Sequence, residues 1–245
     1  FCLLFSYSDE VIKPVFSAED INQKYLVISN QKQNETEKIA VYEFFWYGCP
    51  HCFNLEPTIN KLESNLKSDT VLIKFPLALR DSWLNHAKAY FAIQKMGLED
   101  KLHDKIFEEI HINGNRLDTK DKLIDFIDAQ GFSGSEFSDG FDSFGTEIRI
   151  RKAMRLANTY QISSVPTIVV NGKYLTSGSF VSSYEELYNV INLLVEKNVD
   201  FIYAKEYVDL LENCEIARYS KESNINTESD YENAIKIISK IDKQL

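Results

Sequence analysis

Cys49 and Cys52 flank a Pro-His dipeptide, and two thiols at this spacing can hold a metal ion, staple the chain or exchange electrons. A structural zinc site needs four ligands, but the sequence has no second Cys-x-x-Cys pair and no closely spaced pair of histidines. A disulfide between cysteines so close together removes little chain entropy, so it would stabilise the fold only weakly. Reversible dithiol and disulfide chemistry is the interpretation that remains.

The other histidines of the chain are His86, His103 and His111, and all lie in segments with helical periodicity. We expect them at the surface rather than on a metal ion, because a lone histidine is more often a solvated residue than a ligand. The sequence therefore predicts neither a metal site nor another cofactor.

The position of the cysteines at the start of a helix suggests a division of roles. Unpaired N–H groups and the macrodipole at a helix N-terminus favour a negative sulfur, so the pKa of Cys49 should be depressed. Pro50 suits the first turn because it has no N–H, and a protonated His51 adds positive charge. Cys52 lies one turn further in and should be the less accessible, resolving thiol. A stabilised thiolate favours the reduced form, which makes the disulfide a stronger oxidant.

The elements around this motif indicate an α/β fold. Apolar residues at helical spacing follow Cys49 to about Leu66, and Pro57 should kink that helix. Strands are predicted for residues 24–31, 38–47, 70–79 and 167–170, and from Lys173 after the Asn171-Gly172 hairpin signal. Helices are predicted for residues 145–162 and 182–197, the latter beginning with Ser-x-x-Glu at Ser182 or Ser183. Short helical patterns fill most of residues 80–145 and look like an insertion.

The order of these elements, with Pro57 after the cysteines and the stretch SVPT at 164–167, resembles the thioredoxin fold. The helical insertion, the stretch EFFWYGCPHC and the stretch NGKY narrow the resemblance to the DsbA type of thiol:disulfide oxidoreductase. That resemblance implies a redox-active disulfide between Cys49 and Cys52, with Cys49 as the nucleophile. It also implies that Pro166 is a cis-proline and that Val165 and Pro166 offer backbone groups to a bound peptide.

Glu43 and Lys74 each interrupt an otherwise apolar strand. By pattern alone, a solvent-facing position at a strand end is about as good an interpretation as burial. In the resemblance, the two positions match an acidic and a basic residue buried beneath the active site, where they would influence thiol ionisation and proton movement.

The composition excludes some partners. The chain has 245 residues with 44% hydrophobic composition and a net charge of −10, without a basic run that could follow a phosphate backbone. Nucleic acid is therefore not expected as a partner. No stretch approaches the roughly 20 apolar residues that span a bilayer.

The expected organisation has five parts. These are a signal-peptide remnant at residues 1–8, a thioredoxin domain at 9–79 and 146–197, its helical insertion at 80–145, and a helical extension of unknown role at 198–245. The remnant ends in a small-x-small site, Ser6-Tyr7-Ser8, which favours export, although a buried first strand is the alternative. Cys2 would leave with the signal, or would instead be retained as a lipid-bearing cysteine that tethers the protein. Cys214 would be either a buried small residue or an intermolecular partner, so the oligomeric state stays open.

The sequence therefore predicts a periplasmic enzyme that donates its disulfide to reduced, newly exported proteins. By resemblance, a DsbB-like, quinone-linked membrane protein would reoxidise it. Phe45, Trp46 and Tyr47 could form an apolar docking surface for that partner, or could simply be core residues at the end of the strand. A disulfide reductase or isomerase is the alternative enzyme, and a non-catalytic peptide-binding chaperone is the alternative from another class.

Overall fold

The computed structural model describes residues 24–28 and 38–198 of the chain. The chain divides into two compact units, residues 1–191 and 192–245. In the second unit, residues 192–198 continue the last helix. The expectations for residues 1–8, Cys2, Cys214 and residues 199–245 lie outside the described residues.

Five strands form one mixed sheet in the order β1-β5-β4-β2-β3. They are β1 (Leu26–Val27), β2 (Ile39–Phe45), β3 (Thr70–Pro76), β4 (Thr167–Val170) and β5 (Tyr174–Ser177). β2 and β3 run parallel, and the other three neighbouring pairs are antiparallel. The predicted strands are therefore present, although the described part of the first is much shorter than predicted.

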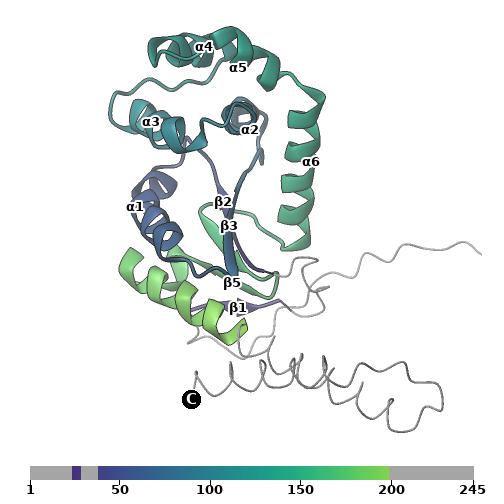
Figure 1. Cartoon of the computed structure of the whole chain (residues 1–245). Helices are drawn as coiled ribbons and strands as arrows, with labels where there is room; N and C mark the ends of the chain where they lie inside the picture. The colour runs from purple at the N-terminus through teal and green to yellow at the C-terminus, as the bar shows by residue number, and fades with distance from the viewer. Residues whose placement is uncertain (1–23, 29–37, 199–245) are drawn as a thin grey trace, which may run out of the picture. The chain divides into compact units, whose positions relative to one another are not determined.

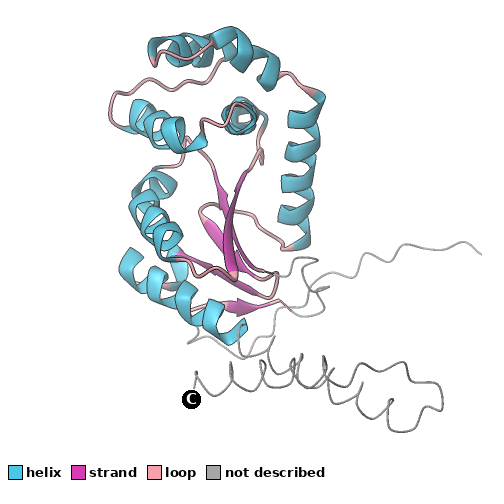
Figure 2. Cartoon of the chain, in the orientation of Figure 1, coloured by secondary structure: helices cyan, strands magenta, loops and turns pink. Residues whose placement is uncertain are grey.

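The helices surround the sheet, as Figure 2 shows. They are α1 (Pro50–Asn65), α2 (Leu84–Lys95), α3 (Glu99–His111), α4 (Lys120–Ala129), α5 (Gly134–Phe141) and α6 (Phe144–Thr159), with a last helix from residue 184. α1 and α6 lie on opposite sides of the sheet, and α2 to α5 gather beyond one end of β2 and β3 (Figure 1). α1 continues through Pro57 as a single helix.

β2 divides its side chains between two cores because successive residues of a strand face opposite sides. Tyr42 and Phe44 pack in one cluster with Ala153 of α6. Phe45 instead packs in a second cluster that contains Cys52 and the apolar residues of α2 to α5. The strand is buried along its whole length, as its continuous apolar sequence predicted, and it brings the chain directly to Cys49.

The turn between β4 and β5 has the conformation that its sequence requires. Asn171 and Gly172 both have positive φ, 52° and 67°, which fits a type I′ hairpin turn. The hairpin places β4 against β2, with Thr167 paired to Phe44. The residue before β4, Pro166, therefore lies near the end of β2 from which the cysteine motif starts.

Candidate active site

Cys49 is the N-cap residue of α1, and Pro50 occupies the first turn. The Cys49 side chain is 8% exposed, whereas Cys52 is fully buried, and both are free thiols. The Phe53 N–H donates to the Cys49 carbonyl at 3.1 Å, which begins the helical hydrogen-bond pattern. The one-turn offset thus places one sulfur near the surface and the other in the core, as expected.

The two thiols have opposite tendencies to ionise. A hydrogen bond from the Cys52 thiol, backbone N–H groups of Cys52 and His51, and the His51 charge together lower the pKa of Cys49 to about 6, against the opposing effect of burial. Burial and the hydrogen bond to Cys49 raise the pKa of Cys52. The reduced pair therefore carries one negative charge at neutral pH, and that charge is on the Cys49 sulfur.

The loop before β4 lies beside this sulfur. The Val165–Pro166 peptide bond is cis. When it is protonated, the Cys49 thiol donates to the Val165 carbonyl at 3.6 Å between Sγ and O, although the two residues are 116 positions apart in the chain. The sheet register thus brings Val165 and Pro166 next to the cysteine that is nearer the surface.

Glu43 and Lys74 are both buried, and they are direct partners across the parallel pair of β2 and β3. Lys74 nevertheless bonds to Glu56 of α1, with 3.1 Å between Nζ and Oε2. Neither carboxyl oxygen of Glu43 has a hydrogen-bond partner. Burial and the nearby Glu56 charge raise the pKa of Glu43 to about 8, although Lys74 opposes them. Glu43 is therefore mostly protonated at neutral pH.

The expectation that the three lone histidines lie at the surface is wrong for His86 and His103, which are each 4% exposed. His86 Nε2 lies 3.0 Å from the Arg116 carbonyl oxygen. His111 is partly buried, and its Nε2 lies 2.7 Å from the Tyr47 carbonyl oxygen. His86 and His111 thus each lie at hydrogen-bonding distance from a backbone carbonyl oxygen.

His103 and Glu56 belong to a polar network that sequence reasoning missed. His103 Nδ1 shares a hydrogen bond of 2.8 Å with the Tyr47 hydroxyl, and His103 Nε2 lies 3.3 Å from Glu56 Oε1. With the Glu56–Lys74 ion pair, these contacts link the turn after β2, α3, α1 and β3. The helical spacing in the sequence could have indicated that both residues are buried. Glu56 lies three residues before Ile59 on the buried face of α1. His103 lies three and four residues before Ile106 and Phe107 on the buried face of α3.

This network also bears on metal binding. Among the described residues, Glu56, His103 and Asp104 have donor atoms within 4.8 Å of one another, a spacing that could hold a metal ion. However, the Lys74 ammonium already bonds to Glu56 at 3.1 Å, so a second cation on this carboxylate would meet a positive charge. The cluster is explained by ion pairing, and it gives no reason to add a metal.

The apolar stretch before Cys49 is largely core. Phe45 and Tyr47 are fully buried, so the predicted docking surface is wrong for these two residues. Trp46 is partly exposed and stacks on Trp83, with 4.2 Å between ring centroids and 6° between planes. Gly48 lies against the same indole, where an added Cβ would be only 2.3 Å from Trp46 Cζ2. Residue 48 must therefore be glycine while Trp46 keeps this position.

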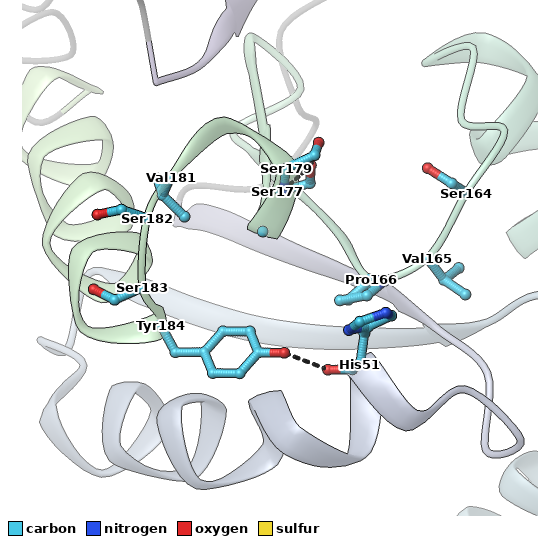
Figure 3. Close-up of a pocket in the computed structure, with 11 residues that line it drawn as sticks. His51, Ser164, Val165, Pro166, Ser177, Ser179, Val181, Ser182, Ser183 and Tyr184 are labelled. Carbon is cyan, nitrogen blue, oxygen red and sulfur yellow. Dashed lines mark hydrogen bonds between the residues drawn. The ribbon is translucent and has the colours of Figure 1, made fainter.

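A cavity of about 600 Å³ opens beside the cis peptide (Figure 3). Its lining includes His51 from the cysteine motif, Val165 and Pro166, and residues from the segment between β5 and the last helix. The Tyr184 hydroxyl donates to the His51 carbonyl oxygen at 3.3 Å, which ties the start of the last helix to the first turn of α1. Val165 therefore both lines the cavity and contacts Cys49.

Comparison with known proteins identifies the family. The family model of the DSBA-like thioredoxin domain matches residues 70–189. The thiol:disulfide interchange protein DsbA of Pseudomonas syringae pv. tomato is 38% identical over 160 residues, which cover 65% of this chain and 75% of that protein. The chain belongs to the DsbA family. The DsbA of Burkholderia cepacia is also similar, with 36% identity over 163 residues, or 66% of this chain and 77% of that protein.

Solved DsbA structures agree with this assignment. The crystal structure of Pseudomonas aeruginosa DsbA is 33% identical and superposes with a TM-score of 0.70, covering 73% of this chain and 94% of that chain. The oxidoreductase DsbA from Xylella fastidiosa gives a TM-score of 0.67 at 26% identity, covering 74% and 97%. The chain is thus a thiol:disulfide oxidoreductase with the thioredoxin fold of the DsbA family. In the described part of the chain, no helix has the length and apolar character needed to cross a membrane.

Proposed function

We propose that this DsbA-family protein oxidises pairs of cysteines in exported proteins by donating a disulfide between Cys49 and Cys52. One observation carries the proposal: the thiol at the helix N-terminus has a pKa of about 6, while burial keeps its partner protonated. A thiolate that is stable in the reduced form favours release of the disulfide to a substrate. Pro50 and His51 contribute by fitting the first helical turn and by adding positive charge near the sulfur.

The exchange takes two steps, and electrons balance across them. A substrate thiolate attacks the Cys49 sulfur, the Cys49–Cys52 bond breaks, and Cys52 leaves with the electron pair and takes up a proton. A second substrate thiolate then attacks the substrate sulfur of the mixed disulfide, and Cys49 leaves as a thiolate. The substrate loses two electrons, and the protein ends as a thiolate and a thiol. Cys49 is the better leaving group because its thiolate is stabilised.

In the first step Cys52 takes up a proton, and Glu43 is a buried acid whose pKa is raised. Its pKa of about 8 keeps it mostly protonated at neutral pH, and when Glu43 is ionised its charge raises the pKa of Cys52. Glu43 is therefore proposed to influence the ionisation of Cys52 and the movement of protons as that sulfur leaves or is reoxidised. Lys74 lowers the pKa of Glu43 and so adjusts the pH at which Glu43 ionises.

Val165 and Pro166 are proposed to hold the substrate backbone. The Val165 carbonyl is 3.6 Å from Cys49 Sγ, so a chain whose cysteine is bonded to Cys49 must pass along this loop. Backbone pairing would hold many different sequences, which suits an enzyme whose substrates share little except a cysteine pair.

The proposed setting is the periplasm, because structural disulfides form and persist in oxidising compartments. Each cycle leaves the protein as a dithiol, so a partner must remove two electrons and the thiol protons. A DsbB-like membrane protein linked to quinone fits this role. Of the three residues considered for docking, only Trp46 offers exposed surface.

The test is the equilibrium of the Cys49–Cys52 pair with glutathione. We expect a potential clearly more oxidising than that of thioredoxin, about −270 mV, because the Cys49 thiolate is stabilised. A value near that of thioredoxin would instead support a reductase. A Cys49→Ala variant should not oxidise a reduced model protein, and wild-type rates in this variant would point to a non-catalytic peptide-binding protein.

A further inference from the structure

The outer face of α6 carries two large apolar side chains that take no part in the core. The inner face of this helix is buried and includes Ile150, Ala153 and Ala157. On the opposite face Phe144 and Ile148 lie one turn apart and are 71% and 46% exposed. Single exposed apolar residues are common on protein surfaces, but neighbouring ones on one helix face indicate contact with another molecule.

The same face of α6 continues as a row of cations. At about 100° per residue, an arc of about 100° holds Phe144, Ile148, Arg151, Lys152 and Arg155, here called the α6 stripe. Arg151 pairs with Glu147 at 2.9 Å between Nη2 and the carboxylate oxygen. Among the described residues, Lys152 and Arg155 are exposed and have no ion-pair partner. The helix contains four basic residues and one acidic residue, whereas the whole chain has 27 basic and 37 acidic residues. Positive charge is therefore concentrated on this helix.

We propose that the α6 stripe docks the protein on the surface of a membrane that contains anionic phospholipids. Cationic side chains are attracted to the phosphate groups, and apolar side chains enter the boundary between headgroups and acyl chains. Such docking is peripheral, so it needs no membrane-spanning helix. It does not depend on the cysteines, so it goes beyond the proposed redox function.

The shape of the α6 stripe favours a lipid surface over a protein partner. The stripe is the exposed ridge of one helix, and α6 forms one side of the described fold in Figure 1. A stable protein interface needs a buried centre in which side chains fill pockets. Two apolar residues on a ridge supply little of such a centre, whereas a fluid headgroup layer can adapt to a convex ridge.

The net charge of −10 does not prevent this docking. At physiological ionic strength the Debye length is about 8 Å, so charges on the far side of the protein act weakly on the membrane. Two nearby carboxylates are already paired, because Glu147 bonds to Arg151 and Asp142 bonds to both Lys88 and Lys120. The charge that the stripe presents is therefore mainly that of Lys152 and Arg155.

Sedimentation with lipid vesicles tests the proposal on the whole chain, prepared without a covalent lipid. We expect wild-type protein to bind vesicles of phosphatidylcholine mixed with phosphatidylglycerol, but not vesicles of phosphatidylcholine alone. Each cation near an anionic surface strengthens binding about fivefold, so a Lys152→Glu, Arg155→Glu double variant should bind at least about 20-fold more weakly. The control, Lys67→Glu with Lys95→Glu, makes the same change in net charge at exposed positions outside α6 and should bind like the wild type.

The apolar part of the α6 stripe has its own test. Phe144→Ser should weaken binding about tenfold, because the ring no longer enters the membrane. The control is Ile112→Ser, which changes an apolar residue of similar exposure, 68%, on another element. Circular dichroism shows whether the variants fold like the wild type.

Several results would overturn the proposal. They are equal binding by the Lys152→Glu, Arg155→Glu variant and the wild type, binding to neither kind of vesicle, and equal binding to both kinds. Binding to soluble polyglutamate without binding to vesicles would also overturn it and would assign the stripe to an acidic protein. Failure of the protein to oxidise reduced substrates would refute the proposed function but would leave the vesicle results unchanged.

Discussion

The hydrogen bond from the Cys52 thiol is the largest cause of the low pKa of Cys49, and two substitutions can isolate it. Cys52→Ser keeps an O–H donor at the same position, whereas Cys52→Ala removes the donor and leaves the helix N-terminus and His51 in place. We therefore expect the Cys49 pKa to be higher in the alanine variant than in the serine variant.

The size of this difference follows from the strength of such a bond. A hydrogen bond to a charged group contributes about 1.5–3 kcal/mol, which corresponds to about 1–2 pKa units. Cys49 titrates at about 6 instead of 9.0, so the donor accounts for a large share of the lowering and the helix N-terminus and His51 for the rest. The alanine variant should consequently keep a pKa below that of an ordinary thiol.

The assay is the rate of alkylation by iodoacetamide as a function of pH, with the ultraviolet absorbance of the thiolate as a second reading. Circular dichroism of both variants checks that they fold alike. If Cys52→Ala and Cys52→Ser titrate at the same pH, the Cys52 donor does not stabilise the thiolate. If the alanine variant titrates like a free cysteine, the helix N-terminus contributes nothing.

Three further predictions concern Glu56, Glu43 and Gly48. Glu56→Gln should lower the free energy of unfolding by about 3–5 kcal/mol in a urea titration, because it leaves Lys74 buried without its ion-pair partner. The control, Glu63→Gln on the exposed side of α1, should change the free energy of unfolding little. Glu43 has a raised pKa, so its burial costs stability as pH rises from about 4.5 to about 8. Glu43→Gln should therefore stabilise the protein more at pH 8 than at pH 5. An equal effect at both pH values would contradict the raised pKa of Glu43. Gly48→Ala should displace Trp46 from Trp83 and change the near-ultraviolet circular dichroism, whereas Gly145→Ala, whose Cβ would meet nothing closer than 3.8 Å, should not.

The reduced and oxidised forms should differ in how their stability depends on pH. The pKa of Cys49 is depressed in the folded reduced protein, so the thiolate stabilises that form fully above the ordinary thiol pKa, and this contribution is lost as pH falls toward 6. Reduced protein should therefore gain stability relative to oxidised protein as pH rises from 6 to 9. Parallel stability curves for the two forms would contradict the low pKa.

The sequence indicated the elements well where local chemistry determines them. The apolar run of β2, the Asn171-Gly172 turn and the position of Cys49 before α1 all follow from short-range rules. The approach of Pro166 to Cys49 depends on the pairing of β4 with β2, across more than a hundred residues. Composition and periodicity do not specify that pairing, so it came from the resemblance to a family.

The buried histidines show a different limit. His103 was expected at the surface because its residue type is usually solvated, yet its place on the wheel of α3 lies among Leu102, Ile106 and Phe107. A polar residue on a buried face needs a partner, and that partner, Glu56, is on another helix. For His103, the position on the helix predicts burial, whereas the residue type alone does not.

The difference in pKa between Cys49 and Cys52 depends both on the junction of β2 and α1 and on the helical insertion. The junction of β2 and α1 supplies the helix N-terminus that holds the Cys49 thiolate. Burial of Cys52 depends on the cluster that also contains Phe45, Tyr47 and the apolar side chains of α2 to α5. The helical insertion therefore acts on the redox chemistry by keeping water from one sulfur. A substitution that loosens this cluster, such as Phe107→Ala, should lower the pKa of Cys52 and weaken the Cys52 donor to Cys49, which a titration of both thiols would detect.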